Sequence, residues 1–213
     1  MSDQVYGEKI LTPPFRVIFP TLFDVDAERE QKKNGKEYKE YSVNALFNKS
    51  ADLKPMLKSV HEVATEKWRS VPKNLKNPFK NGSKEKDLDK YPYYENTIYI
   101  RFSSYDQPGI VDGKMEPVID KSQVYSGCWA RATVVAKTYG GSGTGYQPGV
   151  SFKLQNIQIL PKSFVEQELG LEVEDSALTG RRSSPNEDFD GIDFEADDPA
   201  NYETVEDDIG YDF

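Results

Sequence analysis

Residues 124–161 hold a strand pattern that constrains the fold more than any other stretch of the chain. From position 128 onward the residues separate into two faces when every second residue is grouped, as in a β-strand. One face is small and apolar and contains Cys128, Ala130, Ala132, Val134 and Ala136. Small apolar side chains suit the inside of a narrow, tightly curved barrel. The pattern therefore predicts a mainly β fold closed into a small barrel.

The opposite face of this strand carries Trp129, Arg131, Thr133, Val135, Lys137 and Tyr139. Aromatic rings stack on bases and basic groups meet phosphates, so the face suits nucleic acid. The alternative is that long amphipathic side chains simply cover an exposed strand face. A second strand, at residues 97–105, repeats the pattern. Its inward residues are Ile98, Ile100 and Phe102, and its outward residues are Tyr99, Arg101 and Tyr105. Two such faces in one domain favour the nucleic-acid interpretation.

The glycine-rich stretch at residues 140–149 lacks the Gly-Lys-Ser/Thr ending of a phosphate-binding loop, and a strand follows it instead of a helix. We therefore predict a strand connection. In the strand at 150–160, Phe152 and Leu154 face inward and Lys153 faces outward. Ile157 and Ile159 take the opposite phase, so we expect a β-bulge or burial on both faces there.

Two further strands precede these. Residues 9–19 are predicted to form the first, entered through two prolines, with Phe15, Val17 and Phe19 on one face and Arg16 on the other. Residues 38–47 alternate in the same way and form the second. Residues 24–37 between them are charged and read as an exposed hairpin connection with a turn at Asn34-Gly35.

Apolar residues at helical spacing predict an amphipathic helix over residues 51–68. Ser50 or Asp52 can cap it, and Pro55 fits only its first turn. Residues 71–96 form a long lysine-rich connection that ends in three tyrosines, including Tyr94. Such a connection is functional or disordered, or else simply a solvated loop.

The remaining segments are shorter. Residues 107–123 are irregular, with a turn at Asp112-Gly113, and residues 163–171 form a short helix with Ser163 and Glu166 as a capping box.

The net charge of −9 is unevenly distributed, because residues 183–213 contain twelve carboxylates and no Lys or Arg. Removing them leaves 24 acidic against 27 basic residues, so the body of the chain is mildly basic. A polar, acidic segment of this kind does not bury enough apolar surface to fold. We therefore predict a nucleic-acid-binding domain at residues 1–182 and a disordered acidic tail at 183–213.

Several function classes have little support. Cys128, the single cysteine, excludes an internal disulfide framework and lies on the small-residue face, which indicates a buried, inert thiol. His61, the single histidine, has no second metal-ligating neighbour. The chain lacks a signal-peptide pattern and an apolar run of about 20 residues. We expect no enzyme activity, metal or cofactor, and a cytoplasmic location, in the host cell if a phage encodes the protein.

The order of these segments resembles a known family. The strings EYSVNALF, LKPMLKSVHEVATEKW, KYPYYEN, TIYIRF, VYSGCWARATVVAKTYG and VSFKLQNIQILP follow one another, and the acidic tail ends in Tyr-Asp-Phe. This resembles the OB-fold single-stranded DNA-binding proteins of tailed bacteriophages. The resemblance implies a five-stranded Greek-key barrel with one inserted helix. It also implies coating of single strands in phage replication and recombination, without nucleotide hydrolysis.

We therefore predict a sequence-independent single-stranded DNA-binding protein. The DNA-binding residues, chosen by strand phase, are Arg16, Tyr94, Tyr99, Arg101, Trp129, Arg131, Lys137, Tyr139 and Lys153. The resemblance adds Asp212 and Phe213 as a contact for a replication or recombination protein. The alternative is an acidic-tailed interaction or chaperone module that binds no DNA. No membrane partner is expected, and homo-oligomerisation stays open.

Overall fold

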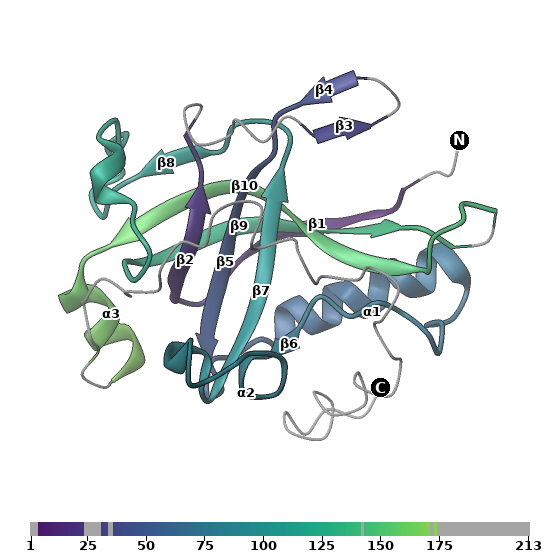
Figure 1. The fold of residues 1–213 in the computed structure, drawn as a ribbon, viewed down its shortest axis with the longest axis horizontal. Coiled ribbons are helices and arrows are strands. Elements are labelled where there is room, and N and C mark those ends of the chain that lie inside the picture. The colour runs from purple at the N-terminus through teal and green to yellow at the C-terminus, as the bar shows by residue number, and fades with distance from the viewer. Residues whose placement is uncertain (1–3, 24–30, 34–35, 142, 171–172, 174–213) are drawn as a thin grey trace.

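The two longest strands, β9 (Trp129–Tyr139) and β10 (Gly149–Leu160), pair antiparallel along their whole length, and the sheet closes on them (Figure 1). This computed structural model describes residues 4–23, 31–33, 36–141, 143–170 and 173. The predicted acidic tail, with Asp212 and Phe213, lies outside these residues.

Three other strands complete the barrel: β2 (Phe15–Thr21), β5 (Tyr41–Asn48) and β7 (Thr97–Ser104). Neighbours around the barrel are β9, β2, β5, β7 and β10, and β10 pairs again with β9. All of these pairs are antiparallel except that of β7 with β10, which is parallel. The predicted five-stranded OB-type barrel is confirmed.

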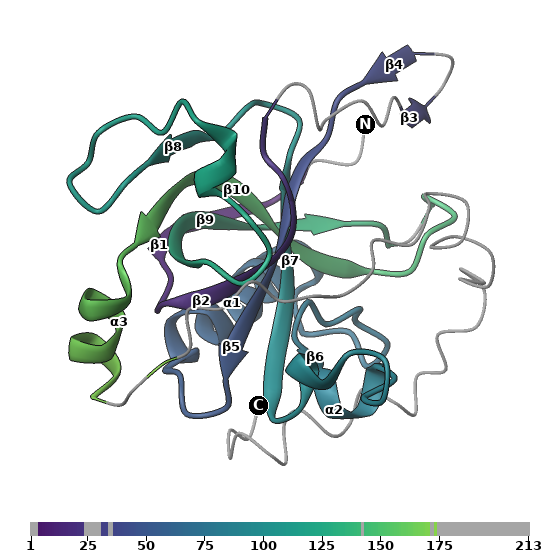
Figure 2. The ribbon, with the colours of Figure 1, turned by 60° about the vertical axis from the view of Figure 1, so that its left-hand side comes forward.

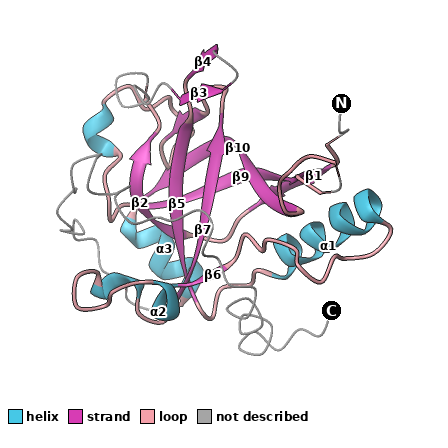
Figure 3. Cartoon of the chain, turned by 45° about the vertical axis from the view of Figure 1, so that its right-hand side comes forward, coloured by secondary structure: helices cyan, strands magenta, loops and turns pink. Residues whose placement is uncertain are grey.

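The remaining elements decorate this barrel. They are β1 (Tyr6–Leu11), β3 (Gln31–Lys33), β4 (Lys36–Tyr38), α1 (Lys54–Trp68), β6 (Lys80–Asn81), α2 (Gly82–Glu85), η1 (Pro92–Tyr94), β8 (Gly109–Val111), η2 (Lys121–Gln123) and α3 (Lys162–Leu169). The β3–β4 hairpin projects away from the barrel (Figure 2). The three α-helices lie outside the strands (Figure 3). Within the described parts of the chain, none of the helices combines the length and apolarity that a bilayer crossing requires.

Small residues on β9 make room for aromatic rings in the barrel. Ala130, Ala132 and Ala136 are buried on its inner face, as predicted. The rings of Phe15, Phe47, Phe102 and Phe152 fill the space opposite, each contacting at least one of the others with centroids 5.4–6.3 Å apart. Cys128 is buried beside them, as expected. Small inward residues on β9 and large aromatic rings on the other strands thus pack into one continuous core.

Several local predictions need correction. The strand predicted over residues 9–19 is two strands, β1 and β2, separated at Pro13-Pro14, because proline does not donate to a sheet ladder. The register of β2 shifts after Ile18, so Phe19 is exposed instead of sharing the inner face. The bulge predicted in β10 is confirmed, between Leu154 and Asn156.

The helix boundaries also differ from those predicted. α1 begins after Leu53, although the Asp52 carboxylate still accepts a hydrogen bond from the Lys54 amide at 3.0 Å. Pro55 lies in the first turn, as expected. α3 begins after Pro161, so Ser163 lies inside the helix and does not cap it. Residues 71–96 contain β6, α2 and η1, and so are not without regular structure.

Candidate functional site

The outward residues of β5, β7, β10 and β9 that lie around Ser42, Ser103, Lys153 and Val135 form one surface, here called the outer face. Ser42, Ser103, Lys153 and Val135 form a row across these four strands, because each lies opposite the next on the neighbouring strand. Outward side chains repeat every second residue, about 7 Å apart along a strand. Arg101 on β7 therefore lies about 7 Å along the strand from Ser103, and Lys137 on β9 lies about 7 Å from Val135. Cationic residues from three strands share this face.

A tyrosine and two lysines meet where β7 ends. The Lys137 ammonium lies 5.7 Å from the centroid of the Tyr105 ring, within the range of a cation–π contact. The Lys153 ammonium lies 2.9 Å from a carboxylate oxygen of the adjacent Asp106. The Tyr105 side chain is 55% exposed, so an aromatic surface remains open to solvent beside two positive charges. Such a combination can stack a base and bind the neighbouring phosphates.

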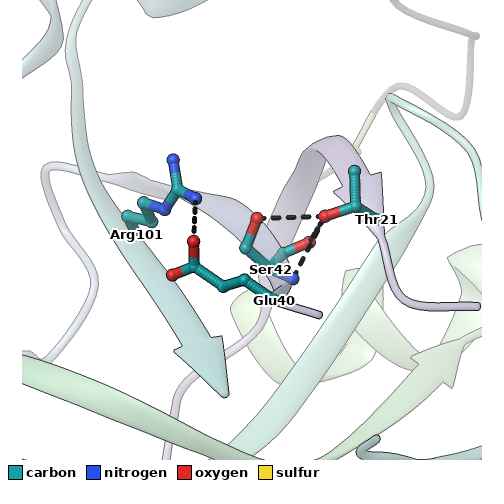
Figure 4. Close-up of polar contacts among 4 residues, drawn as sticks. All are labelled: Thr21, Glu40, Ser42 and Arg101. Carbon is teal, nitrogen blue, oxygen red and sulfur yellow. Dashed lines mark hydrogen bonds and ion pairs between the residues drawn. The ribbon is translucent and has the colours of Figure 1, made fainter. Parts of the chain in front are cut away.

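Arg101 extends this group of cations toward β5. Its Nη2 lies 3.3 Å from Oε2 of Glu40, the residue that immediately precedes β5 (Figure 4). Beside this pair, the Thr21 hydroxyl accepts a hydrogen bond from the Ser42 amide at 3.1 Å and lies 3.0 Å from the Ser42 hydroxyl. The Thr21–Ser42 hydrogen bonds fasten the end of β2 to β5, and the ion pair links Arg101 of β7 to the residue before β5.

Tyr139 lies on the outer side of β9, two residues beyond Lys137, and its position depends on Gly149. These two residues are opposite each other in the β9–β10 pair. A Cβ atom at position 149 would overlap the Tyr139 ring and stand 2.7 Å from its Cε2 atom. The ring therefore lies directly over the glycine, and the predicted stacking residue belongs to the same surface as Lys137.

Tyr94 and Tyr99 belong to a second group, which we call the tyrosine cluster: Tyr91, Tyr93, Tyr94 and Tyr99. Tyr94 and Tyr99 are in edge contact, with centroids 5.2 Å apart. The Lys86 ammonium lies 5.5 Å from the Tyr94 centroid and 5.2 Å from the Tyr99 centroid. Tyr94 is buried on Ile18 and Leu46, which face outward from β2 and β5. The lysine-rich connection thus covers one end of the outer sheet surface with aromatic rings and cations.

Burial changes the acidity of this cluster. Desolvation, assisted by Tyr91, raises the pKa of Tyr93 to about 12. Desolvation, assisted by the neighbouring Tyr93 and Tyr91, also raises the pKa of Tyr94. Both phenols therefore remain protonated at neutral pH.

The other three predicted DNA contacts lie at the opposite end of β9. Trp129 is 8% exposed and packs against Leu160 and against Val165 of α3. The Arg16 guanidinium lies near its ring. Arg131 donates from Nε to the Gln158 side chain at 2.8 Å and lies 5.3 Å from the Phe164 centroid. The structure therefore does not bring Arg16, Trp129 and Arg131 together with Lys137 and Lys153.

Tyr105 and Tyr146 are exposed and were not selected from the sequence. Tyr105 continues the outward phase of its strand, a signal that was available. Tyr146, 73% exposed, lies in the β9–β10 connection, where no periodicity marks it. His61 is exposed on α1, and the described residues contain no group of three or more His, Cys, Asp or Glu side chains arranged to hold a metal ion.

A family model and a phage protein each match most of this chain. A family model described as the ssDNA-binding protein of Enterobacter phage Enc34 matches residues 8–199. "Putative protein p50" of Acyrthosiphon pisum secondary endosymbiont phage 1 is 28% identical over 159 residues, which cover 70% of this chain and 82% of that protein.

Two solved structures share the fold. The single-stranded DNA-binding protein of bacteriophage Enc34 aligns with a TM-score of 0.57 at 13% identity, covering 85% of this chain and 89% of that one. The same protein in complex with ssDNA aligns with a TM-score of 0.53 at 17% identity, covering 71% of this chain and 85% of that one.

Proposed function

The chain belongs to the family of single-stranded DNA-binding proteins represented by that of Enterobacter phage Enc34, and we propose that it coats single-stranded DNA during phage replication and recombination. It acts in the host cytoplasm, binds without sequence preference and catalyses no reaction. Every base has a π-face and every nucleotide a phosphate, so stacking and charge contacts tolerate any sequence.

The outer face is the proposed DNA site, and the observation that carries this assignment is the Lys137–Tyr105 contact beside Lys153. Bases stack on Tyr105, Tyr99 and Tyr139, while Arg101, Lys137 and Lys153 bind phosphates. In OB-folds the second and third strands and the loops after the first and fourth strands bind oligonucleotides. Here those strands are β5 and β7, and the loop after the fourth strand is the connection that carries Tyr146.

The other predicted contacts take supporting roles in this proposal. The Tyr94 and Trp129 rings are 2% and 8% exposed, too little for a base to cover one face. We assign Tyr94 to holding the lysine-rich connection on the sheet and Trp129 to holding α3. Arg16 and Arg131 lie beyond the outer face and contribute at most a long-range attraction for the phosphate backbone.

A titration of fluorescein-labelled oligo-dT with the full-length protein, followed by anisotropy, tests the function. Tight binding is expected, equal for dT and mixed-sequence oligonucleotides. The logarithm of the binding constant should fall with the logarithm of salt concentration by about 0.7 per phosphate contacted. A preference for duplex of the same length at moderate salt would contradict the proposal. Absence of DNA binding would favour a protein-interaction module instead.

Residues 183–213 form, in this proposal, a separate acidic tail that follows the DNA-binding domain at 1–182. Twelve carboxylates tethered near a cationic face act as an intramolecular competitor for DNA, at an effective concentration that reaches about millimolar. Asp212 and Phe213 then recruit a replication or recombination protein. Deleting 183–213 should tighten DNA binding at low salt, whereas deleting Phe213 alone should abolish recruitment and leave DNA binding unchanged. Equal DNA affinity of the truncated and full-length chains at every salt concentration would exclude the competition.

A further inference from the structure

Arg101 and Lys153 of the proposed DNA site each have a carboxylate within ion-pair distance. Arg101 Nη2 lies 3.3 Å from Glu40 Oε2, and Lys153 Nζ lies 2.9 Å from Asp106 Oδ2 (Figure 4 for the first pair). Glu40 immediately precedes β5 and Asp106 follows β7. Because Tyr41 pairs with Ser104 across these antiparallel strands, both carboxylates come from the same edge of the outer face.

Each of these ion pairs has one exposed partner, which limits what it contributes to the folded state. The side chain of Arg101 is 55% exposed and that of Asp106 is 82% exposed, although Glu40 and Lys153 are more covered, at 17% and 31%. Water screens such pairs, and fixing two long side chains costs conformational entropy. Fold stability alone therefore explains poorly why Glu40 and Asp106 lie beside Arg101 and Lys153.

Their effect on an anionic ligand is larger. A carboxylate oxygen and a phosphate oxygen use the same N–H donors of Arg and Lys. A phosphate that approaches Arg101 or Lys153 competes with the carboxylate for these donors, and the carboxylate, a few ångströms away, repels it. At this separation the repulsion exceeds thermal energy even in water, and salt reduces it.

We propose that Glu40 and Asp106 are internal competitors of the DNA phosphates, which hold the affinity for single-stranded DNA below the value that the cations would give alone. This inference rests on the proposed function, and it concerns the regulation of the same site. Each carboxylate reoccupies its cation when a phosphate leaves, so the protein dissociates more readily from a strand that is being copied.

The test compares Glu40→Gln, Asp106→Asn and the double variant with the wild-type protein. Glu62→Gln is the matched control, because Glu62 also forms an exposed ion pair, 3.7 Å from Lys58, and lies on α1, outside the strands that carry Arg101, Lys137 and Lys153. All variants keep the shape of the side chain and remove one negative charge per substitution. The probe is labelled oligo-dT of roughly 16 nucleotides, the upper site size of one OB-fold, titrated at low and high salt.

Glu40→Gln and Asp106→Asn should each bind the oligonucleotide about fivefold more tightly than wild type at low salt, and the gain should shrink at about 1 M salt. Glu62→Gln should change the affinity less than twofold. If the two site variants bind no more tightly than Glu62→Gln, the competition is overturned while the proposed function stands. If no protein in the series binds oligo-dT, the proposed function fails together with this inference. Should Glu40→Gln not fold, Asp106→Asn decides alone, because Asp106 is 82% exposed.

Discussion

The guanidinium carbon of Arg16 lies 5.9 Å from the centroid of the Trp129 ring, and α3 packs against the same tryptophan. Two side chains that strand phase assigns to the DNA surface therefore contact each other, and a helix packs on one of them. Arg16 Nε also donates to the Gly127 carbonyl oxygen at 3.4 Å, which further fixes its direction. Both residues are on the outside of the barrel, but α3 packs on Trp129 and Arg16 is half-buried beside the tryptophan ring.

This arrangement predicts that Trp129→Ala mainly lowers stability. Removing a large aromatic side chain from a packed cluster costs about 3–5 kcal/mol. The affinity of the folded protein for oligo-dT should remain within about twofold of wild type, since the ring does not reach the outer face. Thermal melting and anisotropy titration of the same preparation separate the two effects. A stable variant with affinity lowered by about 1–3 kcal/mol would instead mean that a base stacks on Trp129.

Tyr105→Ala should have the opposite profile. The ring is 55% exposed, so its removal should change the melting temperature little, whereas loss of a stacking surface should weaken binding by about 1–3 kcal/mol. Tyr105→Phe is the control, because it keeps the ring and the cation–π contact with Lys137. Equal affinities for the Ala and Phe variants would remove Tyr105 from the proposed DNA site.

Gly149→Ala is expected to act through Tyr139. The added methyl group overlaps the ring, and overpacking of this kind costs about 1–3 kcal/mol. The displaced ring should also weaken DNA binding. In a Tyr139→Ala background the same change should have almost no effect on either stability or affinity, which a double-mutant cycle measures. Additive losses would show that Gly149 serves the backbone and not the ring.

The tyrosine cluster predicts a loss of stability in alkali. The folded-state pKa of Tyr93 is raised from 10.0 to about 12, and that of Tyr94 is raised as well, so the unfolded chain loses these protons first. Fewer protons bound in the unfolded state mean that the free energy of unfolding decreases as pH rises from 10 through 12. Denaturant unfolding across this range should show a smaller decrease for Tyr93→Phe/Tyr94→Phe than for wild type. Parallel curves for the two proteins would contradict the assignment.

The sequence pattern predicted the barrel well because inward and outward residues alternate regularly along most of its strands. The small inner residues of β9, the large apolar inner residues of β7 and the reversed phase of Ile157 each have a direct counterpart in the structure. Where the backbone departs from regular geometry the prediction failed. Phe19 lies at a shift in register next to Pro20, a proline inside the strand that the phase assignment did not take into account, so the phase assigned to Phe19 was wrong.

The site was harder to predict for a different reason. Alternation separates the inside of a barrel from its outside, but it does not reveal which outside residues a later segment covers. Trp129 is covered by α3, and Leu46 by the tyrosine cluster, segments that follow them by more than 30 residues. Glu40 likewise reaches Arg101 only because β5 and β7 are neighbours. Contacts of this kind depend on tertiary packing, which the periodicity of one strand does not contain.

Closure of the barrel also has a consequence for biosynthesis. Phe15 on β2 completes its pairing only with Ala130 on β9, more than 100 residues later. At about 5–20 residues per second, β2 waits on the order of ten seconds for its partner to be translated. During that interval the phenyl ring of Phe15 has no barrel interior to enter. A chain that ends before residue 129 lacks β9 and β10, and cannot close the barrel. Premature termination anywhere upstream should therefore yield an aggregating fragment instead of a smaller working protein.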